Sequence, residues 1–215
     1  MKIAILGAGL VGGTLGSRWA GRGHQVTFGC RADSTRFVPG GTRHATIPDA
    51  AYDAQVVVLA VPWDAVPEVL RRAAIGLADK VLLDCTNPFS RDTRFGLRGP
   101  LEMGPNGESG AERIARMAPE ARVVKIFNST TYTNLSAYFG KDVRAVMPYA
   151  GDSVEAKAIA HELATQLYLD PVDAGPLVVA RELEHLASLW IAISKQSRRE
   201  FAFGMLKRET YRREK

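Results

Sequence analysis

Residues 1–13, which read MKIAILGAGLVGG, decide the fold class. An apolar run over residues 3–6 ends in a Gly-x-Gly-x-x-Gly pattern, and a helical pattern follows directly. In this context the first glycine permits a tight turn, the second lets the backbone approach a phosphate, and the third lets helix and strand pack closely. A glycine-rich turn that binds nothing is the alternative. The N–H groups that open the helix favour an anion. The motif therefore predicts a pyrophosphate site formed by Gly7, Ala8, Gly9, Leu10, Val11 and Gly12.

Further apolar runs, many of them β-branched, alternate with helical patterns along the chain. Continuous apolar runs suit strands that are buried on both faces of a parallel sheet. The order predicts an α/β fold with a doubly wound, mostly parallel sheet. The expected strands cover residues 2–6, 25–29, 56–61, 80–84, 122–127, 143–147 and 169–173. The expected helices cover residues 12–22, 63–74, 111–117, 154–167 and 179–197.

Several local signals divide the chain further. The pattern changes near residue 130, so we expect a dinucleotide-binding domain over residues 1–130 and a small C-terminal α/β domain over residues 131–215. Ser109 and Glu112 have the spacing of a capping box, and Asp152 with Glu155 suggests a similar helix start. Residues 96–110 are rich in glycine and proline and are expected to form a loop.

The composition excludes several classes of protein. The chain has 215 residues, of which 46% are hydrophobic and 24% charged, as in an ordinary soluble domain that needs no disulfide or metal. Cys30 and Cys85 do not form a disulfide framework, and no run is long enough to span a membrane or act as a signal peptide. Most of the net charge of +5 falls in residues 198–215, and no metal-ligand spacing occurs. We expect a cytoplasmic protein without nucleic-acid, membrane or metal partners.

The end of the second expected strand predicts which dinucleotide binds. An NAD site places an acidic residue there, where it binds the ribose 2′-hydroxyl. This chain has Cys30 and Arg31 instead, and Arg36 follows shortly. The Arg31 guanidinium can pair with a 2′-phosphate, and Arg36 can add a second charge. We therefore expect NADP(H) to be preferred over NAD(H).

The ends of the next strands are expected to line the same cleft, because open α/β sheets bind ligands at the carboxyl ends of their strands. Neutral polar side chains and prolines gather there. The residues expected to border the dinucleotide are Ala60, Val61, Pro62, Trp63, Asn87 and Pro88. The residues expected to form the pocket of a second ring are Asn128, Ser129, Met147 and Trp190.

No group for acid–base chemistry is evident. Reduction of a carbonyl needs a proton donor near the nicotinamide, usually Tyr, His or Lys. The candidates share no diagnostic spacing, and they are Tyr132, Tyr149, Lys125, His185 and Lys195. Hydride transfer between a nicotinamide and a second redox ring needs mainly proximity and orientation. We assign no catalytic residue and favour that reaction.

The chain as a whole resembles the NADPH-dependent reductases of the deazaflavin coenzyme F-420. The matching pieces are GAGLVGG (7–13), GHQVTFGCR (23–31), VVLAVPW (57–63), DCTNP (84–88), SGAE (109–112), VVKIFN (123–128) and PVDAGPL (171–177). Residues 180–184, ARELE, are also similar to the reductase domain of the six-transmembrane metalloreductases, which use NADPH and flavin.

The resemblance implies a Rossmann-type domain with a small C-terminal domain, and a second redox ring in the cleft between them. That ring would be coenzyme F-420, FMN or FAD. In the family a small hydroxylated residue and an arginine hold the 2′-phosphate; Arg31 matches the arginine, whereas Cys30 stands where serine is common. Ala8 stands where some members have threonine.

The sequence leaves two other functions and a homodimer as alternatives. An NADPH-dependent carbonyl or imine reductase would use Tyr132 or Tyr149 as its donor. A non-catalytic protein that senses NADP(H) would bind the dinucleotide without turnover. The expected last helix is apolar on much of its circumference, so it is buried either within one subunit or in a homodimer. Its apolar residues are Leu183, Leu186, Ala187, Leu189, Trp190, Ile191 and Ile193.

Overall fold

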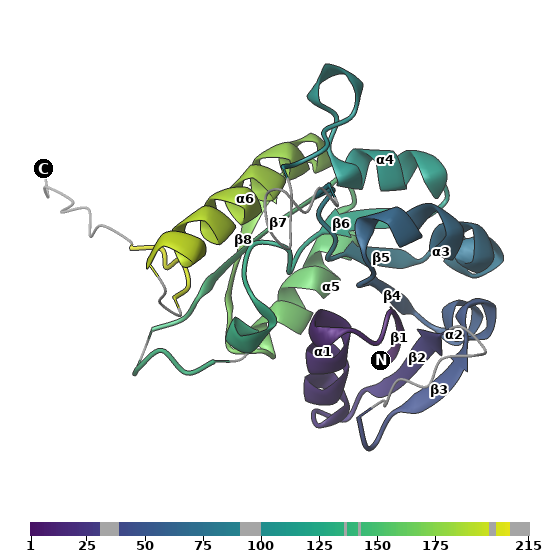
Figure 1. The fold of residues 1–215 in the computed structure, drawn as a ribbon. Coiled ribbons are helices and arrows are strands. Elements are labelled where there is room, and N and C mark those ends of the chain that lie inside the picture. The colour runs from purple at the N-terminus through teal and green to yellow at the C-terminus, as the bar shows by residue number, and fades with distance from the viewer. Residues whose placement is uncertain (31–38, 91–99, 136, 142, 198–200, 207–215) are drawn as a thin grey trace, which may run out of the picture.

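The computed structural model describes residues 1–30, 39–90, 100–135, 137–141, 143–197 and 201–206. Eight strands form one sheet in the order β3-β2-β1-β4-β5-β6-β7-β8 (Figure 1). The strands are β1 (Lys2–Leu6), β2 (Gln25–Cys30), β3 (Arg43–Thr46), β4 (Val56–Leu59), β5 (Val81–Asp84), β6 (Arg122–Lys125), β7 (Val146–Gly151) and β8 (Asp170–Gly175). All neighbouring strands are parallel except β6 and β7. The doubly wound, mostly parallel α/β fold is therefore confirmed.

Helices cover both faces of the sheet. They are α1 (Leu10–Ala20), α2 (Ile47–Asp53), α3 (Val66–Ala73), α4 (Gly110–Met117), α5 (Val154–Thr165) and α6 (Ala180–Ser197). One apolar core lies between the sheet and α1 with α5, and a second lies between the sheet and α2, α3 and α4. The strands are buried on both faces, which explains their continuous apolar runs.

Strands on both sides of residue 130 belong to one sheet. Val124 pairs with Gly151 and Lys125 with Ala150, so β7 extends the sheet begun by β1. The indole N–H of Trp19 on α1 also donates to the carbonyl of Leu163 on α5, at 3.2 Å. The division at residue 130 thus falls between two paired strands, and it stays a prediction.

Some local expectations are corrected. Ser153, not Asp152, caps α5, because its hydroxyl accepts the N–H of Ala156; Asp152 instead accepts the N–H of Leu177 at 2.9 Å. The capping box of Ser109 and Glu112 at the start of α4 is confirmed. Strand β7 covers Val146–Gly151, later than the expected 143–147. Strand β3 and helix α2 were not expected.

The last helix divides into a buried and an exposed part. Leu183 and Ala187 are buried within the subunit, whereas Leu189 is 51% exposed and Ile193 is also exposed. Burial within one subunit therefore does not account for all the apolar surface of α6, and a homodimer stays a prediction. Within the described ranges, no helix combines the length and apolar character that a membrane span requires.

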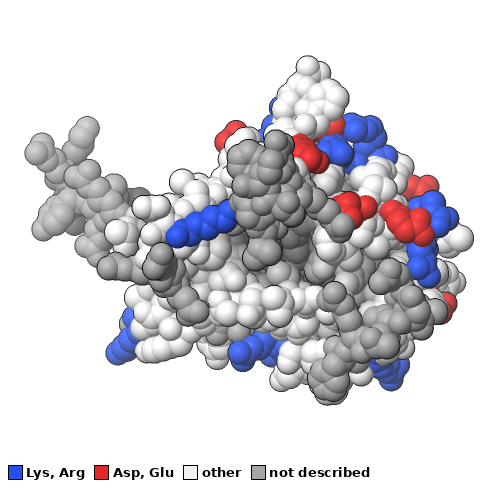
Figure 2. Space-filling model, in the orientation of Figure 1, with Lys and Arg blue, Asp and Glu red and all other residues white. Residues whose placement is uncertain are grey.

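Charged side chains of both signs lie side by side over α3 and α4 (Figure 2). Arg71 pairs there with Glu68 at 2.8 Å, and Arg116 pairs with Glu108. Exposed pairs of this kind contribute little to stability.

Candidate functional site

A cleft of about 410 Å³ lies at the carboxyl ends of the parallel strands. It is bounded by the start of α1, by the segments that follow β4 and β5, and by the segment that follows β6. Its lining residues are Gly9, Leu10, Val11, Ala60, Val61, Pro62, Trp63, Asp64, Cys85, Asn87, Phe89, Ser90, Phe127, Asn128, Thr130, Thr131 and Tyr132. This is the edge of an α/β sheet at which ligands bind.

The glycine turn at one end of the cleft tolerates no side chain at two positions. Gly7 has φ +115°, and a Cβ there would lie 2.5 Å from the carbonyl oxygen of Ala60. A Cβ on Gly12 would lie 2.0 Å from the carbonyl oxygen of Gly7. Gly9 caps α1 without a side chain, so no cap covers the N–H groups of its first turn where they meet the cleft. The turn fits a pyrophosphate.

Trp63 forms part of the wall of the cleft and is held from behind. The guanidinium of Arg113 lies 4.6 Å from its ring centre. A Cβ on Gly110 would come within 3.1 Å of the Trp63 ring and 3.3 Å of Pro88. Trp63 and Pro88 therefore pack on the glycine that starts α4, which fixes the wall against the second core.

Two asparagines form the floor between β5 and β6. The Asn87 side-chain N–H donates to the backbone carbonyl of Asn128, and the Asn128 side-chain N–H donates to Asn87 Oδ1, both at 3.0 Å. Asn128 Nδ2 also donates to the carbonyl of Leu183 on α6 at 3.0 Å. The floor of the cleft is thus tied directly to the C-terminal helix.

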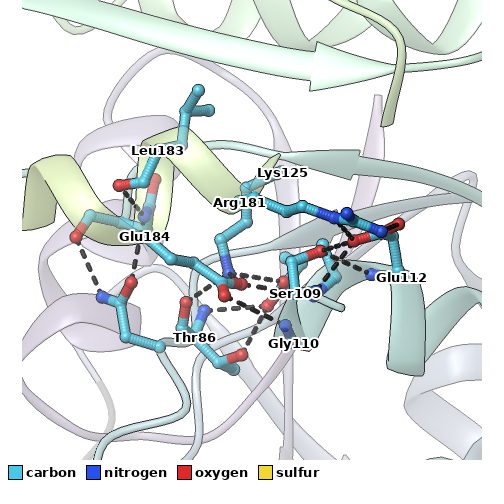
Figure 3. A network of polar contacts seen from close by, with 12 residues as sticks. Thr86, Ser109, Gly110, Glu112, Lys125, Arg181, Leu183 and Glu184 are labelled. Carbon is cyan, nitrogen blue, oxygen red and sulfur yellow. Dashed lines mark hydrogen bonds and ion pairs between the residues drawn. The ribbon is translucent and has the colours of Figure 1, made fainter. Parts of the chain in front are cut away.

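A buried charge network joins β5, β6 and α6 (Figure 3). Lys125 is fully buried, and its Nζ lies 2.9 Å from Asp84 and 2.8 Å from Glu184. The same Nζ donates to the carbonyl of Thr86. Burial alone would lower the pKa of Lys125, but the Asp84 and Glu184 carboxylates outweigh burial and hold that pKa above its ordinary value. Lys125 is fully buried and does not line the cleft, so its ammonium serves as structure rather than as a proton donor.

Glu184 and Arg181 join α6 to the start of α4. Glu184 accepts the backbone N–H groups of Gly110 at 3.0 Å and Ala111 at 3.3 Å. Arg181 makes a two-pronged contact with Glu112, at 2.9 and 2.7 Å. The hydrogen bond from Arg181, helped by those from Ser109, lowers the pKa of Glu112 to about 2. Acceptors at the N-terminus of α4 suit its free N–H groups and its dipole.

Comparison with known proteins assigns a family to this arrangement. A family model described as "NADP oxidoreductase coenzyme F420-dependent" matches residues 2–88. The "F420-dependent NADP reductase" of Methanothermobacter thermautotrophicus is 32% identical over 214 residues, which cover 92% of this chain and 91% of that protein. The chain belongs to the family of coenzyme F-420-dependent NADP oxidoreductases. It is an NADP-dependent oxidoreductase.

Further relatives share the family or the fold. The crystal structure of a "putative f420 dependent nadp-reductase" from Arthrobacter sp. fb24 has a TM-score of 0.84 and 31% identity, and covers 96% of this chain and 100% of that one. Metalloreductase STEAP3 of Rattus norvegicus is 30% identical over 184 residues, 85% of this chain; the chain spans 36% of that protein. A reductive aminase from Aspergillus terreus, at 22% identity over 91% of this chain and 62% of that one, shares the fold with a TM-score of 0.66.

In this NADP oxidoreductase, the cleft contains part of each predicted set of residues. Of the glycine turn, Gly9, Leu10 and Val11 line it directly. Cys30 ends β2 and is buried, whereas Arg31 and Arg36 lie outside the described residues. The remaining predicted dinucleotide neighbours that line it are Ala60, Val61, Pro62, Trp63 and Asn87.

Of the four residues expected around a second ring, Asn128 alone lines the cleft. Ser129 and Met147 are buried away from it. Trp190 stacks on Phe201 with ring centres 5.3 Å apart, and its indole N–H donates to the Phe201 carbonyl. Met147 lies on β7 within the first core, and Trp190 lies partly buried on α6; the sequence did not specify how these two elements pack.

The candidate proton donors lie in different parts of the structure. Tyr132 lines the cleft. Tyr149 is buried on β7, and its hydroxyl lies 3.3 Å from Nδ1 of His161 on α5. His185 and Lys195 lie on α6, away from the cleft, and the ring of His185 contacts the Arg181 carbonyl.

Sequence reasoning missed the partners of Lys125 and part of the lining. Asp84 and Lys125 stand in apolar strand runs, and a buried charge requires a partner, so their position was a usable signal. Glu184 carried no such signal, because it lies in a helix with both charged and apolar residues. The lining residues that were in neither predicted set and not among the donor candidates are Asp64, Cys85, Phe89, Ser90, Phe127, Thr130 and Thr131.

Proposed function

We propose that this NADP oxidoreductase transfers a hydride between NADP(H) and the redox ring of a deazaflavin, coenzyme F-420, or of a flavin. The observation that carries this proposal is the character of the cleft. One end is a glycine turn that fits a pyrophosphate, and the other end is formed by aromatic, amide and hydroxyl side chains. The similarity to the archaeal reductase over almost its full length supports the deazaflavin as the first choice.

The proposed dinucleotide runs across the carboxyl edge of the sheet. NADPH supplies a hydride when bound, and the residues of the chain bind and orient the NADPH. Arg31, with Cys30 and Arg36, would hold the 2′-phosphate beyond β2, and the α1 turn would hold the pyrophosphate. Pro62 and Trp63 border the middle of the cleft. No side chain is assigned to covalent or acid–base work.

An anaerobic assay with NADPH tests the proposal. Parallel reactions contain oxidised coenzyme F-420, FMN or FAD, each followed at its own absorbance band. We expect NADPH-dependent bleaching of the deazaflavin band. Bleaching of FMN or FAD alone would assign the flavin. Binding of NADPH without reduction of any ring would contradict hydride transfer to a redox ring and favour the NADP(H) sensor and the carbonyl or imine reductase alike.

A carbonyl or imine reductase is the second candidate, because Tyr132 lines the cleft. Its hydroxyl is of the kind that donates a proton to a reduced carbonyl. Tyr132→Phe would then abolish turnover of a carbonyl or imine panel with NADPH binding intact. The buried Tyr149→Phe variant is the matched control, because Tyr149 does not line the cleft.

A further inference from the structure

The amide oxygen of Asn128 is an acceptor without a partner, on a residue that lines the cleft. The residue is 5% exposed and lines the cleft. Its Nδ2 is engaged twice, by Asn87 Oδ1 and by the Leu183 carbonyl, each at 3.0 Å. Among the residues that the structure describes, Asn128 Oδ1 is the one buried side-chain nitrogen or oxygen atom without a hydrogen-bond partner. Buried polar atoms without partners are rare, and each calls for a partner such as a water molecule, an ion or a ligand.

The orientation of this amide is dictated by its neighbours. The Leu183 carbonyl can only accept, so the group that faces it must be the Asn128 NH₂. Asn87 likewise turns its own NH₂ to the Asn128 backbone carbonyl, which leaves Asn87 Oδ1 as the acceptor for Asn128. Exchanging oxygen and nitrogen in either amide would set two acceptors against each other. The free atom of Asn128 is therefore its oxygen, and it requires a donor.

The backbone around Asn128 is held in an unusual conformation. Phe127 has φ +60°, in the left-handed region that a bulky aromatic residue rarely adopts. Its ring packs edge-on against Trp19 with centres 5.8 Å apart, while Lys125 is fixed by its two carboxylates. Packing on both sides thus maintains a strained turn that places Asn128 in the cleft, as is common at binding sites.

The strand order indicates which part of the dinucleotide reaches Asn128. In the sheet, β2 lies on one side of β1, whereas β4, β5 and β6 lie on the other. The proposed 2′-phosphate site follows β2 and the pyrophosphate turn follows β1, so the nicotinamide end extends toward β6. Asn128 lies just after β6. The nicotinamide ring bears one hydrogen-bond donor group, its carboxamide NH₂.

We propose that Asn128 Oδ1 accepts a hydrogen bond from the nicotinamide carboxamide and thereby selects the amide and sets the orientation of the ring. This inference rests on the NADP(H) cleft of the proposed function. It concerns the binding of the dinucleotide and not its turnover, so the inference and the proposed hydride transfer can fail separately. Asn87 and the Leu183 carbonyl act as positioning groups that hold the amide of Asn128.

Analogues of NADP⁺ test the inference in binding experiments with the full chain. The 3-acetylpyridine analogue replaces the carboxamide NH₂ with a methyl group, and the thionicotinamide analogue keeps the NH₂. We expect the wild type to bind the acetylpyridine analogue about tenfold more weakly than NADP⁺, the effect of losing one hydrogen bond. The thionicotinamide analogue should bind within a few-fold of NADP⁺. Titration calorimetry measures each dissociation constant.

The Asn128→Ala variant should lose this discrimination, so that NADP⁺ and the acetylpyridine analogue bind with nearly equal affinity. Asn134→Ala is the matched control. Asn134 is also a buried asparagine whose Nδ2 donates to a backbone carbonyl, that of Phe201, but it does not line the cleft. That variant should retain the wild-type ratio.

Two results would overturn the inference. One is a wild-type protein whose dissociation constants for the acetylpyridine analogue and for NADP⁺ are nearly equal. This measurement needs no variant, so it decides the matter even if Asn128→Ala fails to fold. The other is a folded Asn128→Ala protein that still discriminates as the wild type does. A chain that discriminates but reduces no ring keeps this inference and loses the proposed hydride acceptor. A chain that reduces a ring without discriminating keeps the proposed hydride transfer and loses this inference.

Discussion

Glu184→Gln is expected to destabilise the protein strongly, although the two side chains have the same shape. Glu184 is fully buried, lies 2.8 Å from Lys125 Nζ, and accepts two N–H groups at the start of α4. All three neighbours are donors, so an amide NH₂ must face at least one of them. The substitution also leaves Lys125 with Asp84 as its remaining carboxylate.

The size of the effect follows from these contacts. Removing one partner of a buried ion pair costs about 3–5 kcal/mol. Glu184 Oε1 contacts both Lys125 Nζ and the Ala111 N–H, and Oε2 accepts the Gly110 N–H. Since Asp84 stays in place and a Gln oxygen at the Oε1 position keeps two of these contacts, we expect the lower end, about 3 kcal/mol. For a chain of this length that corresponds to a fall in Tm of about 6–12 °C. Urea unfolding followed by circular dichroism measures the free energy, provided that the transition is two-state.

Two further variants test the reasoning behind this prediction. Glu182→Gln removes a charge from an exposed position of the same helix and should change the free energy of unfolding by less than about 0.5 kcal/mol. In a Lys125→Met background, Glu184→Gln should cost less than in the wild type, because no ammonium is left unpaired. If Glu184→Gln unfolds at the same urea concentration as the wild type, the network does not stabilise the fold and the account is wrong.

Three other outcomes are expected. Arg31→Ala should raise the KM for NADPH by about ten- to a hundredfold and leave that for NADH unchanged, because it removes a charge-assisted bond; steady-state kinetics with both cofactors checks this, and equal effects would refute the role of Arg31 in binding the 2′-phosphate. Gly12→Ala should abolish NADPH binding or folding, since its Cβ would lie 2.0 Å from the Gly7 carbonyl oxygen; calorimetry and a melting curve check this, and wild-type binding by a folded variant would refute it. The pKa of Glu112 falls from 4.5 to about 2 through Arg181, so this carboxylate stabilises the fold above pH 4.5 and loses that contribution as the pH falls toward 2. Glu112→Gln should flatten the dependence of unfolding free energy on pH over this interval, and an unchanged slope would contradict the assignment.

The sequence predicted the central strands and most helices because they carry strong periodic or apolar signals. It did not predict β3, because Arg43–Thr46 is a short edge strand with little apolar character. Helix α2 was also missed. It starts at Ile47 and is capped by Thr46, whose hydroxyl accepts the N–H of Asp49, and a short helix of this kind has little periodicity. The start of β7 was misplaced because residues 143–147 are apolar without being strand throughout.

By itself, the sequence determined the features that depend on neighbouring residues. The glycine turn after β1 follows from steric limits on residues 7–12, and the alternation of buried strands with helices follows from hydrophobic patterning. Both act over a few residues, so they can be recognised without knowledge of the rest of the chain.

The tertiary structure alone decided which distant groups meet. Lys125 pairs with Asp84 across 41 residues, and Asn128 reaches the Leu183 carbonyl across 55. No local pattern encodes those contacts, because they arise when β5, β6 and α6 pack and every buried polar atom must find a partner. Tertiary packing also kept Met147 and Trp190 out of the cleft lining and left Asn128 Oδ1 without a hydrogen-bond partner.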